Sequence, residues 1–177
     1  MKTGTIIFLN GTSSSGKSSI AKALQQILDT PALHVEIDTF TQMLPEGFLE
    51  TAVPELRRET AARLVSGFHH AVAALASVGN TIILDHVVPS PQWWQECMTL
   101  FAPYRLITAG VYCSLEELER RETDRGDRQP GLARMQFAHV HQHGSYQVEV
   151  DTTRLQPEAC ARQIQAALLL PQADAVG

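Results

Sequence analysis

The sequence has few of the features that mark secreted, zinc-binding or membrane proteins. Its three cysteines, Cys97, Cys113 and Cys160, lie far apart, and no C-x-x-C pair occurs, so neither a disulfide framework nor a zinc site is indicated. The N-terminus lacks the pattern of a signal peptide, and no apolar segment is long enough to span a bilayer. We therefore expect a reduced, cytoplasmic compartment and no membrane partner.

Positive charge is also scarce. The 177 residues carry a formal net charge of −5, whereas proteins that bind nucleic acids or membrane surfaces usually present a basic face. An N-K-x-D element, which would indicate a guanine-specific GTPase, is missing as well. The length suits one domain with a sizeable core, so we expect residues 1–177 to form a single unit without a nucleic-acid partner. A homo-oligomer is compatible with this sequence.

One stretch near the N-terminus predicts a phosphate site. Residues 11–18, GTSSSGKS, fit the P-loop pattern G-x-x-x-x-G-K-[ST]. The apolar run at 5–9 predicts a buried strand before the loop, and the apolar spacing in 19–28 predicts a helix after it. Glycines let successive backbone N–H groups point at one anion, and the positive end of the helix dipole adds to the attraction. The alternative is a Gly/Ser-rich turn with an exposed lysine.

The residues of this loop divide by role. Lys17 can reach the β- and γ-phosphates of a nucleotide, which makes it a candidate catalytic residue, and the Ser18 hydroxyl can ligate Mg²⁺. The residues that we expect to contact ATP here are Gly11, Thr12, Ser13, Ser14, Ser15, Gly16, Lys17, Ser18 and Ser19.

Strands and helices alternate along the rest of the chain, which predicts an α/β fold with a five-stranded parallel sheet flanked by helices. Continuous apolar runs at 81–85 and 106–113 predict central strands, like 5–9, whereas period-two alternation at 33–38 and 148–151 predicts edge strands. Helices are expected at 54–77, through 93–98, from 115 into an arginine-rich run, at 132–142 and at 157–170.

Two acids follow strands at the edge of the sheet where ligands bind in such folds. Asp85 ends a buried strand as a Walker B acid does, so we expect it to hold Mg²⁺, the alternative being a turn aspartate. Asp38 ends an edge strand and is the candidate that accepts or orients a hydroxyl proton, with Glu36 as a rival base and a capping role as the alternative. Residues 39–60 should wall the acceptor pocket.

An arginine-rich segment at 120–131 has the character of a lid. Arg121 and Arg125 are four residues apart and share a helix face, and Arg128 follows the bend at Gly126. Guanidinium groups bind phosphoryl oxygens bidentately, so Arg125 and Arg128 are candidate catalytic residues and Arg121 is a candidate nucleotide ligand. The alternative is a solvated face balanced by Glu122, Asp124 and Asp127.

These stretches together resemble the chloramphenicol phosphotransferase family of P-loop kinases. The matching segments are IIFLNGTSSSGKSSI, IDTF around Asp38, IILDHV around Asp85, RETDRGDR, and GSYQVEVDTT at 144–153. The resemblance implies a nucleoside-monophosphate-kinase-like fold and transfer from ATP to a hydroxyl of a small molecule. It also implies that Asp38 is the acid–base residue and that the RGDR arginines contact phosphate.

The resemblance leaves the acceptor open. The family often has an acid where this chain has His86, and the segment 39–60 is shorter than in the antibiotic-modifying member. The acceptor could be chloramphenicol, which would imply a role in antibiotic resistance, or a nucleotide, a sugar acid, shikimate or a UDP-sugar. A nucleotide-binding module without catalysis is the non-enzymatic alternative.

Overall fold

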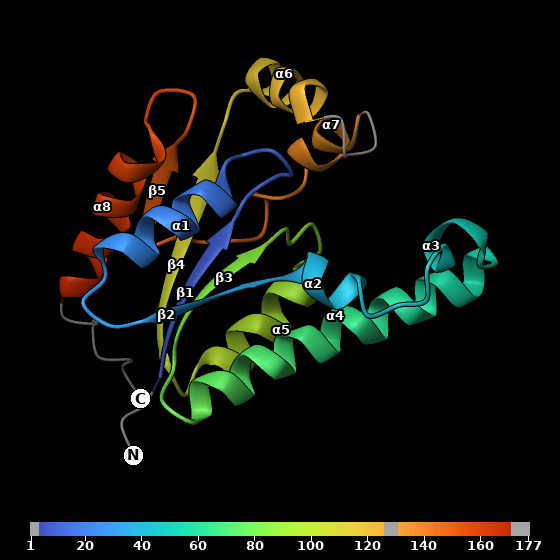
Figure 1. Ribbon diagram of the computed structural model, residues 1–177, viewed down its shortest axis with the longest axis horizontal. Helices are drawn as coiled ribbons and strands as arrows, with labels where there is room; N and C mark the ends of the chain where they lie inside the picture. Colours follow the sequence, from blue (N-terminus) through green and yellow to red (C-terminus); the bar gives the residue numbers. More distant parts are fainter. Residues whose placement is uncertain (1–3, 126–130, 171–177) are drawn as a thin grey trace.

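A parallel sheet of five strands forms the centre of the computed structural model, which describes residues 4–125 and 131–170 (Figure 1). The strands are β1 (Thr5–Asn10), β2 (Ala32–Glu36), β3 (Thr81–His86), β4 (Arg105–Tyr112) and β5 (Val148–Asp151). Their order is β2-β3-β1-β4-β5, and every neighbouring pair is parallel. The two alternating segments therefore form the edges and the continuous apolar runs form the centre, which confirms both predictions.

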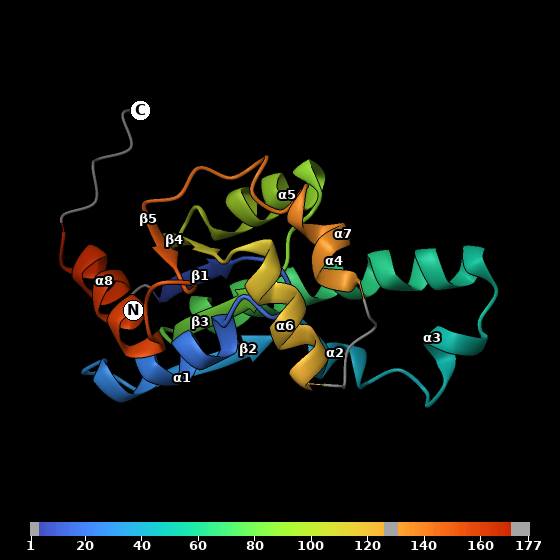
Figure 2. The same cartoon turned by 90° about the horizontal axis from the view of Figure 1, so that it is seen from above.

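Helices cover both faces of this sheet. They are α1 (Lys17–Ile27), α2 (Ile37–Thr41), α3 (Phe48–Thr51), α4 (Pro54–Ser77), α5 (Pro91–Phe101), α6 (Leu115–Arg125), α7 (Leu132–Phe137) and α8 (Pro157–Leu169). Figure 2 shows α1 and α8 against one face and α4 and α5 against the other. Helices α6 and α7 lie at the carboxyl ends of the strands (Figure 1). Within the described ranges, no helix is long and apolar enough to cross a membrane.

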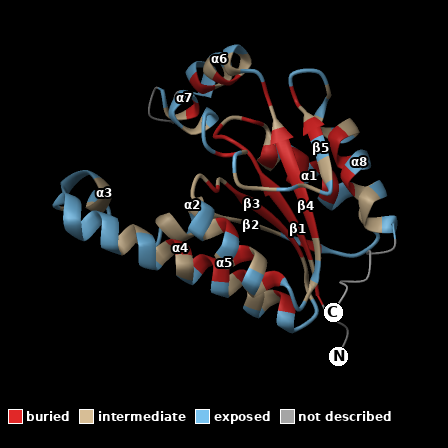
Figure 3. Cartoon of the chain, turned by 180° about the vertical axis from the view of Figure 1, so that it is seen from behind, coloured by how far each residue is buried: buried red, intermediate tan, exposed pale blue. Residues whose placement is uncertain are grey.

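The core has two layers because alternate side chains of each strand point to opposite faces. Ile7 and Leu9 of β1 are fully buried against α1 and α8, whereas Phe8 is fully buried against α5. Phe8 stacks on Trp94, with ring centroids 5.5 Å apart, and meets Phe101 edge to face at 6.2 Å. Figure 3 shows the three inner strands, β1, β3 and β4, buried along most of their length, as expected where a sheet is covered on both faces.

The structure differs from the sequence-based prediction after β2 and within α7. The strand ends at Glu36, and the next five residues form α2, so Asp38 lies in a short helix instead of ending the strand. This turn lets Phe40 pack edge to face on Phe68 of α4, with centroids 5.0 Å apart. The helix expected at 132–142 stops at Phe137, because the chain then turns to place the Val140 carbonyl on the Asn10 side chain.

Replacing Phe8 should show how much the α5-side layer contributes to stability. Phe8→Ala removes a fully buried ring that two aromatic neighbours enclose, so the free energy of unfolding should fall by about 3–5 kcal/mol. Chemical denaturation followed by circular dichroism measures the change. Leu56→Ala, at a position 45% exposed on α4, is the control and should cost less than about 0.5 kcal/mol. Equal losses in the two variants would contradict the assigned core.

Candidate active site

The loop between β1 and α1 folds into a phosphate cradle. Gly16, with a φ of 92°, precedes α1, and Ser14 also has a positive φ of 63°. At Gly11 an added Cβ would lie 2.5 Å from the Val111 carbonyl oxygen, so only glycine lets the loop pass β4 this closely. The Oγ atoms of Ser14 and Ser15 are buried and have no hydrogen-bond partner in the described part of the chain. Unsatisfied donors beside a helix N-terminus fit the phosphates of ATP.

Lys17, Ser18 and Asp85 meet beside this cradle. Lys17 Nζ donates to the Thr12 carbonyl at 2.9 Å and lies 3.6 Å from Asp85 Oδ1, while Ser18 Oγ donates to Asp85 Oδ2 at 2.7 Å. Burial alone would raise the pKa of Asp85, but the Lys17 ammonium and the neighbouring His34 and Ser18 lower it to about 2. Asp85 is therefore charged at neutral pH, and its carboxylate and the Ser18 hydroxyl fit a Mg²⁺ ion.

These groups line a cavity of about 560 Å³ at the carboxyl edge of the sheet. The order of the strands determines which groups meet in the cavity. The P-loop follows the central strand β1, whereas Glu36 ends the edge strand β2 and Asp38 comes just after it. Residues of the segment from Thr152 to Pro157 follow the opposite edge strand, β5. The predicted site residues in its wall are Ser13, Ser14, Gly16, Lys17, Ser18, Ser19, Asp38, Asp85, Arg121 and Arg125. Gly11, Thr12 and Ser15 are buried P-loop residues that do not line it, and Arg128 lies outside the described residues.

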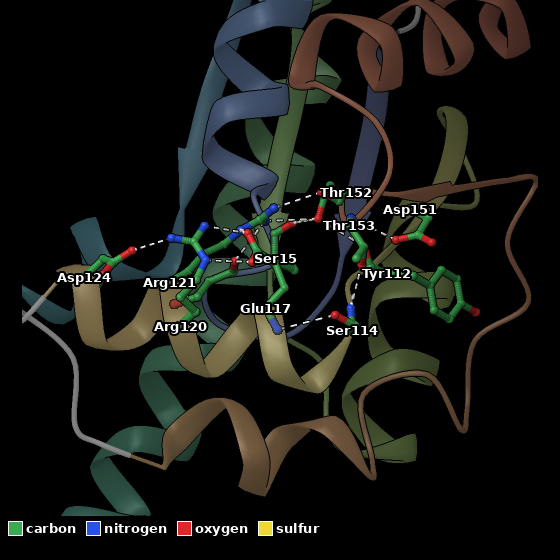
Figure 4. Close-up of polar contacts among 11 residues, drawn as sticks. Ser15, Tyr112, Ser114, Glu117, Arg120, Arg121, Asp124, Asp151, Thr152 and Thr153 are labelled. Carbon is green, nitrogen blue, oxygen red and sulfur yellow. Dashed lines mark hydrogen bonds and ion pairs between the residues drawn. The ribbon is translucent and has the colours of Figure 1, made fainter.

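Arg121 joins α6 to the P-loop and to the turn after β5 (Figure 4). Its guanidinium donates to the Thr152 carbonyl at 2.8 Å, to Thr152 Oγ1 at 3.2 Å, to the Ser14 carbonyl at 3.5 Å and to Glu117 Oε1 at 2.8 Å. Thr152 Oγ1 in turn donates to the Ser15 carbonyl at 2.8 Å. Arg121 thus holds the cavity wall together through contacts with the protein, and Thr152 is a site residue that sequence reasoning missed.

Glu122, expected as a counter-charge on a solvated face, is buried. Its two carboxylate oxygens accept hydrogen bonds from the backbone N–H groups of Gly131 and Ala133, at 2.7 and 2.9 Å. These contacts fix the start of α7 against α6. Helix α7 reaches the P-loop itself, because Gln136 Oε1 accepts the N–H of Ser13 at 2.7 Å. The arginine-bearing helix is therefore anchored next to the phosphate cradle.

The end of the cavity beside β2 carries the acidic groups. Glu36 pairs in register with Asp85, and Asp38 lies two residues further on, in the first turn of α2. Both acids line the cavity. His34, which sequence reasoning did not select, lies 3.5 Å from Asp85 Oδ2 through its Nε2. The period-two alternation of residues 33–38 puts His34 and Glu36 on the same face of the strand, and this was the sequence feature from which His34 could have been found.

Comparison with known proteins identifies the family. A model of the family described as chloramphenicol phosphotransferase-like protein matches residues 4–169. The chain belongs to the chloramphenicol phosphotransferase-like family. Two proteins from two strains of Mycobacterium tuberculosis, which carry the provisional name O-phosphotransferase, are 32% identical to it over 184 residues, covering 93% of this chain and 82% of theirs.

Solved structures show that this family member has the fold of P-loop kinases. The APS kinase of Mycobacterium tuberculosis, in complex with AMPPNP and APS, superposes with a TM-score of 0.73 at 16% sequence identity. The superposition covers 95% of this chain and 99% of the APS kinase chain. Shikimate kinase from Acinetobacter baumannii, in complex with shikimate, gives a TM-score of 0.68 at 12% identity, with 95% and 94% coverage. At such identities the similarity concerns the fold alone.

Next to Asp85 in the sequence begins a row of hydrogen-bonded polar side chains, of which His86 and His69 are buried. His86 Nε2 lies 3.1 Å from His69 Nε2, His69 Nδ1 lies 2.8 Å from Glu96 Oε2, and Ser66 Oγ donates to Glu96 Oε1 at 2.6 Å. An ionised carboxylate only accepts, so His69 donates through Nδ1 and accepts from the Nε2–H of His86. Burial lowers the pKa of His86 to about 3 and also lowers the pKa of His69. Both rings are therefore neutral at neutral pH.

This pair of histidines should make stability fall in mild acid. The folded protein rejects protons that the unfolded chain binds below about pH 6.5, so the free energy of unfolding should decrease as the pH falls from about 6.5 toward 3. The slope can reach about 1.4 kcal/mol per pH unit for each histidine. Denaturant titrations at a series of pH values measure it.

The variant His69→Gln should reduce this slope below about pH 6.5, because one titrating ring is removed. His70→Gln is the matched control, because His70 is the adjacent residue of α4 and is exposed. A slope in His69→Gln equal to that of the wild type would contradict the explanation.

Proposed function

We propose that the protein transfers the γ-phosphate of ATP to a hydroxyl group of a small molecule. One observation carries the proposal: a single cavity contains the P-loop cradle and, two strands along the same edge of the sheet, the carboxylates of Glu36 and Asp38. Membership of the chloramphenicol phosphotransferase-like family and the kinase fold support ATP as the donor. The names of the mycobacterial relatives support transfer to oxygen.

The phosphate side of the cavity suits the stabilisation of negative charge. The P-loop N–H groups and Lys17 would bind the β- and γ-phosphates, and Ser18 and Asp85 would hold Mg²⁺. When bound, Mg²⁺ neutralises charge on the phosphate oxygens. Arg125 lines the same wall, and we assign it, together with Arg128, to the charge that develops on the transferred group. The segment 120–131 would then act as the lid.

At the other end, Asp38 suits the acceptor hydroxyl better than Glu36 does. Glu36 Oε2 lies 3.9 Å from His34, within the same cluster as Asp85, which supports a role for Glu36 on the proposed metal side. Asp38 stands beyond that cluster and is next to the apolar Ile37 in the wall of the cavity. We assign Asp38 to orienting the hydroxyl and accepting its proton. Residues 39–60 follow it in the chain and remain the proposed acceptor wall, although none of them lines this cavity.

The reaction is tested by ATP consumption that depends on an added acceptor. The screen should cover hydroxylated antibiotics, including chloramphenicol, together with sugars, sugar acids and nucleosides. The expected result is turnover with one structural class of alcohol and formation of its phosphate ester, detected by mass spectrometry. ATP binding without turnover for any alcohol would instead favour a nucleotide-binding module.

Removal of the P-loop lysine should abolish transfer. Lys17→Ala eliminates a buried ammonium aimed at the phosphates, so kcat should fall by about 100-fold or more while the circular dichroism spectrum stays unchanged. Lys22→Ala, on the exposed face of the same helix, is the matched control and should leave kcat within a factor of about two. Near-normal turnover of a folded Lys17→Ala protein would refute the catalytic role of the loop.

The acid–base assignment predicts a separation of kcat from nucleotide affinity. Asp38→Asn keeps the shape of the side chain and removes its charge, so kcat should fall by about 10²- to 10⁴-fold with little change in ATP affinity. Stopped-time assays and nucleotide titration measure the two quantities separately. Glu46→Gln, an exposed acid in the same segment, serves as the control. If Glu36→Gln lowered kcat in this way and Asp38→Asn did not, Glu36 would be the base.

A further inference from the structure

Three potential metal ligands converge under the N-terminus of α1. His34 and Glu36 lie on β2, two residues apart and therefore on one face, and the parallel register places Glu36 beside Asp85 of β3. One ligand atom from each side chain lies within 4.8 Å of the other two. The His34 Nε2 atom is 3.5 Å from Asp85 Oδ2 and 3.9 Å from Glu36 Oε2.

An independent observation concerns the imidazole itself. His34 Nε2 is buried, yet it makes no hydrogen bond with any of the described residues. A buried nitrogen without a partner costs free energy, and most such atoms in proteins are satisfied. This atom faces two carboxylate oxygens, and a cation bound between the three atoms would satisfy all of them together.

The separations suit one small cation. Ligand atoms about 2.0–2.2 Å from an ion with tetrahedral coordination lie about 3.3–3.6 Å apart. The His34–Asp85 separation of 3.5 Å falls in this range. The His34–Glu36 separation of 3.9 Å is slightly longer, and a small rotation of the Glu36 side chain would shorten it into the range. The Ser18 Oγ atom, 2.7 Å from Asp85 Oδ2, is close enough to serve as a fourth ligand.

Charge also favours a cation at this place. The Lys17 ammonium lies on the Oδ1 side of Asp85, which leaves Oδ2 toward His34. Two carboxylates and an imidazole resemble the ligand sets of first-row transition metals, whereas Mg²⁺ prefers oxygen ligands alone.

We propose that His34, Glu36 and Asp85 form a binding site for a divalent first-row transition-metal ion, such as Mn²⁺, Co²⁺ or Zn²⁺, in the protein without nucleotide. This goes beyond the phosphotransferase reaction, because the ion is held by the protein alone and needs no phosphate ligand. Asp85 would belong to both the nucleotide-free site and the Mg²⁺–ATP site.

The test is a titration of the nucleotide-free, untagged protein with Co²⁺. The expected result is one Co²⁺ per chain and visible d–d absorption that indicates a nitrogen ligand. His34→Gln should weaken Co²⁺ binding by about tenfold or more and shift the absorption band, because the nitrogen is lost. Glu36→Gln should weaken Co²⁺ binding by a similar factor. If His34→Gln does not fold, Co²⁺ binding by Glu36→Gln tests the proposal in its place. His139→Gln, at an exposed position after α7, is the control and should bind like the wild type.

Two results would overturn the proposal. One is the absence of Co²⁺ binding to the folded wild type at micromolar to millimolar concentrations, in which case His34 serves only to bridge two carboxylates. The other is binding that survives in both His34→Gln and Glu36→Gln or disappears in His139→Gln, which would place the ion elsewhere. Because no nucleotide or acceptor is present, failure here leaves the phosphotransferase proposal untouched, and the lack of an acceptor would leave this site untouched.

Discussion

The charge on buried Asp85 is the constraint around which the cavity is built. A carboxylate withdrawn from water is costly unless opposite charge and donors surround it. Here the compensation comes from Lys17 and Ser18 at the start of α1 and from His34 on β2. Three separate elements must therefore meet at one point. The strand order, with β3 between β1 and β2, is what brings them together.

The opposite half of the cavity is held together by hydrogen bonds from both charged and neutral side chains. Arg121 ties α6 to the turn after β5, and Thr152 ties that turn to the P-loop (Figure 4). Glu122 holds α7, and α7 reaches back to Ser13 through Gln136. The P-loop is thus linked to elements from the last third of the chain, so its conformation depends on tertiary contacts as well as on its own glycines.

Local patterns predicted the sheet well, because alternation and continuous apolar runs report how many faces of a strand are covered. The P-loop, its flanking elements and the 24-residue helix α4 were likewise evident from the sequence. The short helix α2 was missed because five residues carry no periodic signal. His34, Glu122 and Thr152 were missed for another reason. Their roles arise from partners 9 to 137 positions away along the chain, and only the folded structure brings those partners close.

Helix α3 and the first turns of α4 extend away from the sheet, beyond the two packed layers (Figures 1 and 3). Apolar side chains there remain in water: Val53, just before α4, is 61% exposed, and Leu56, in the first turn of α4, is 45% exposed. Substitutions or insertions in this arm remove few core contacts, so they cost little folding free energy. Evolution can therefore alter this arm without first gaining stability elsewhere, while the sheet and the P-loop stay the same.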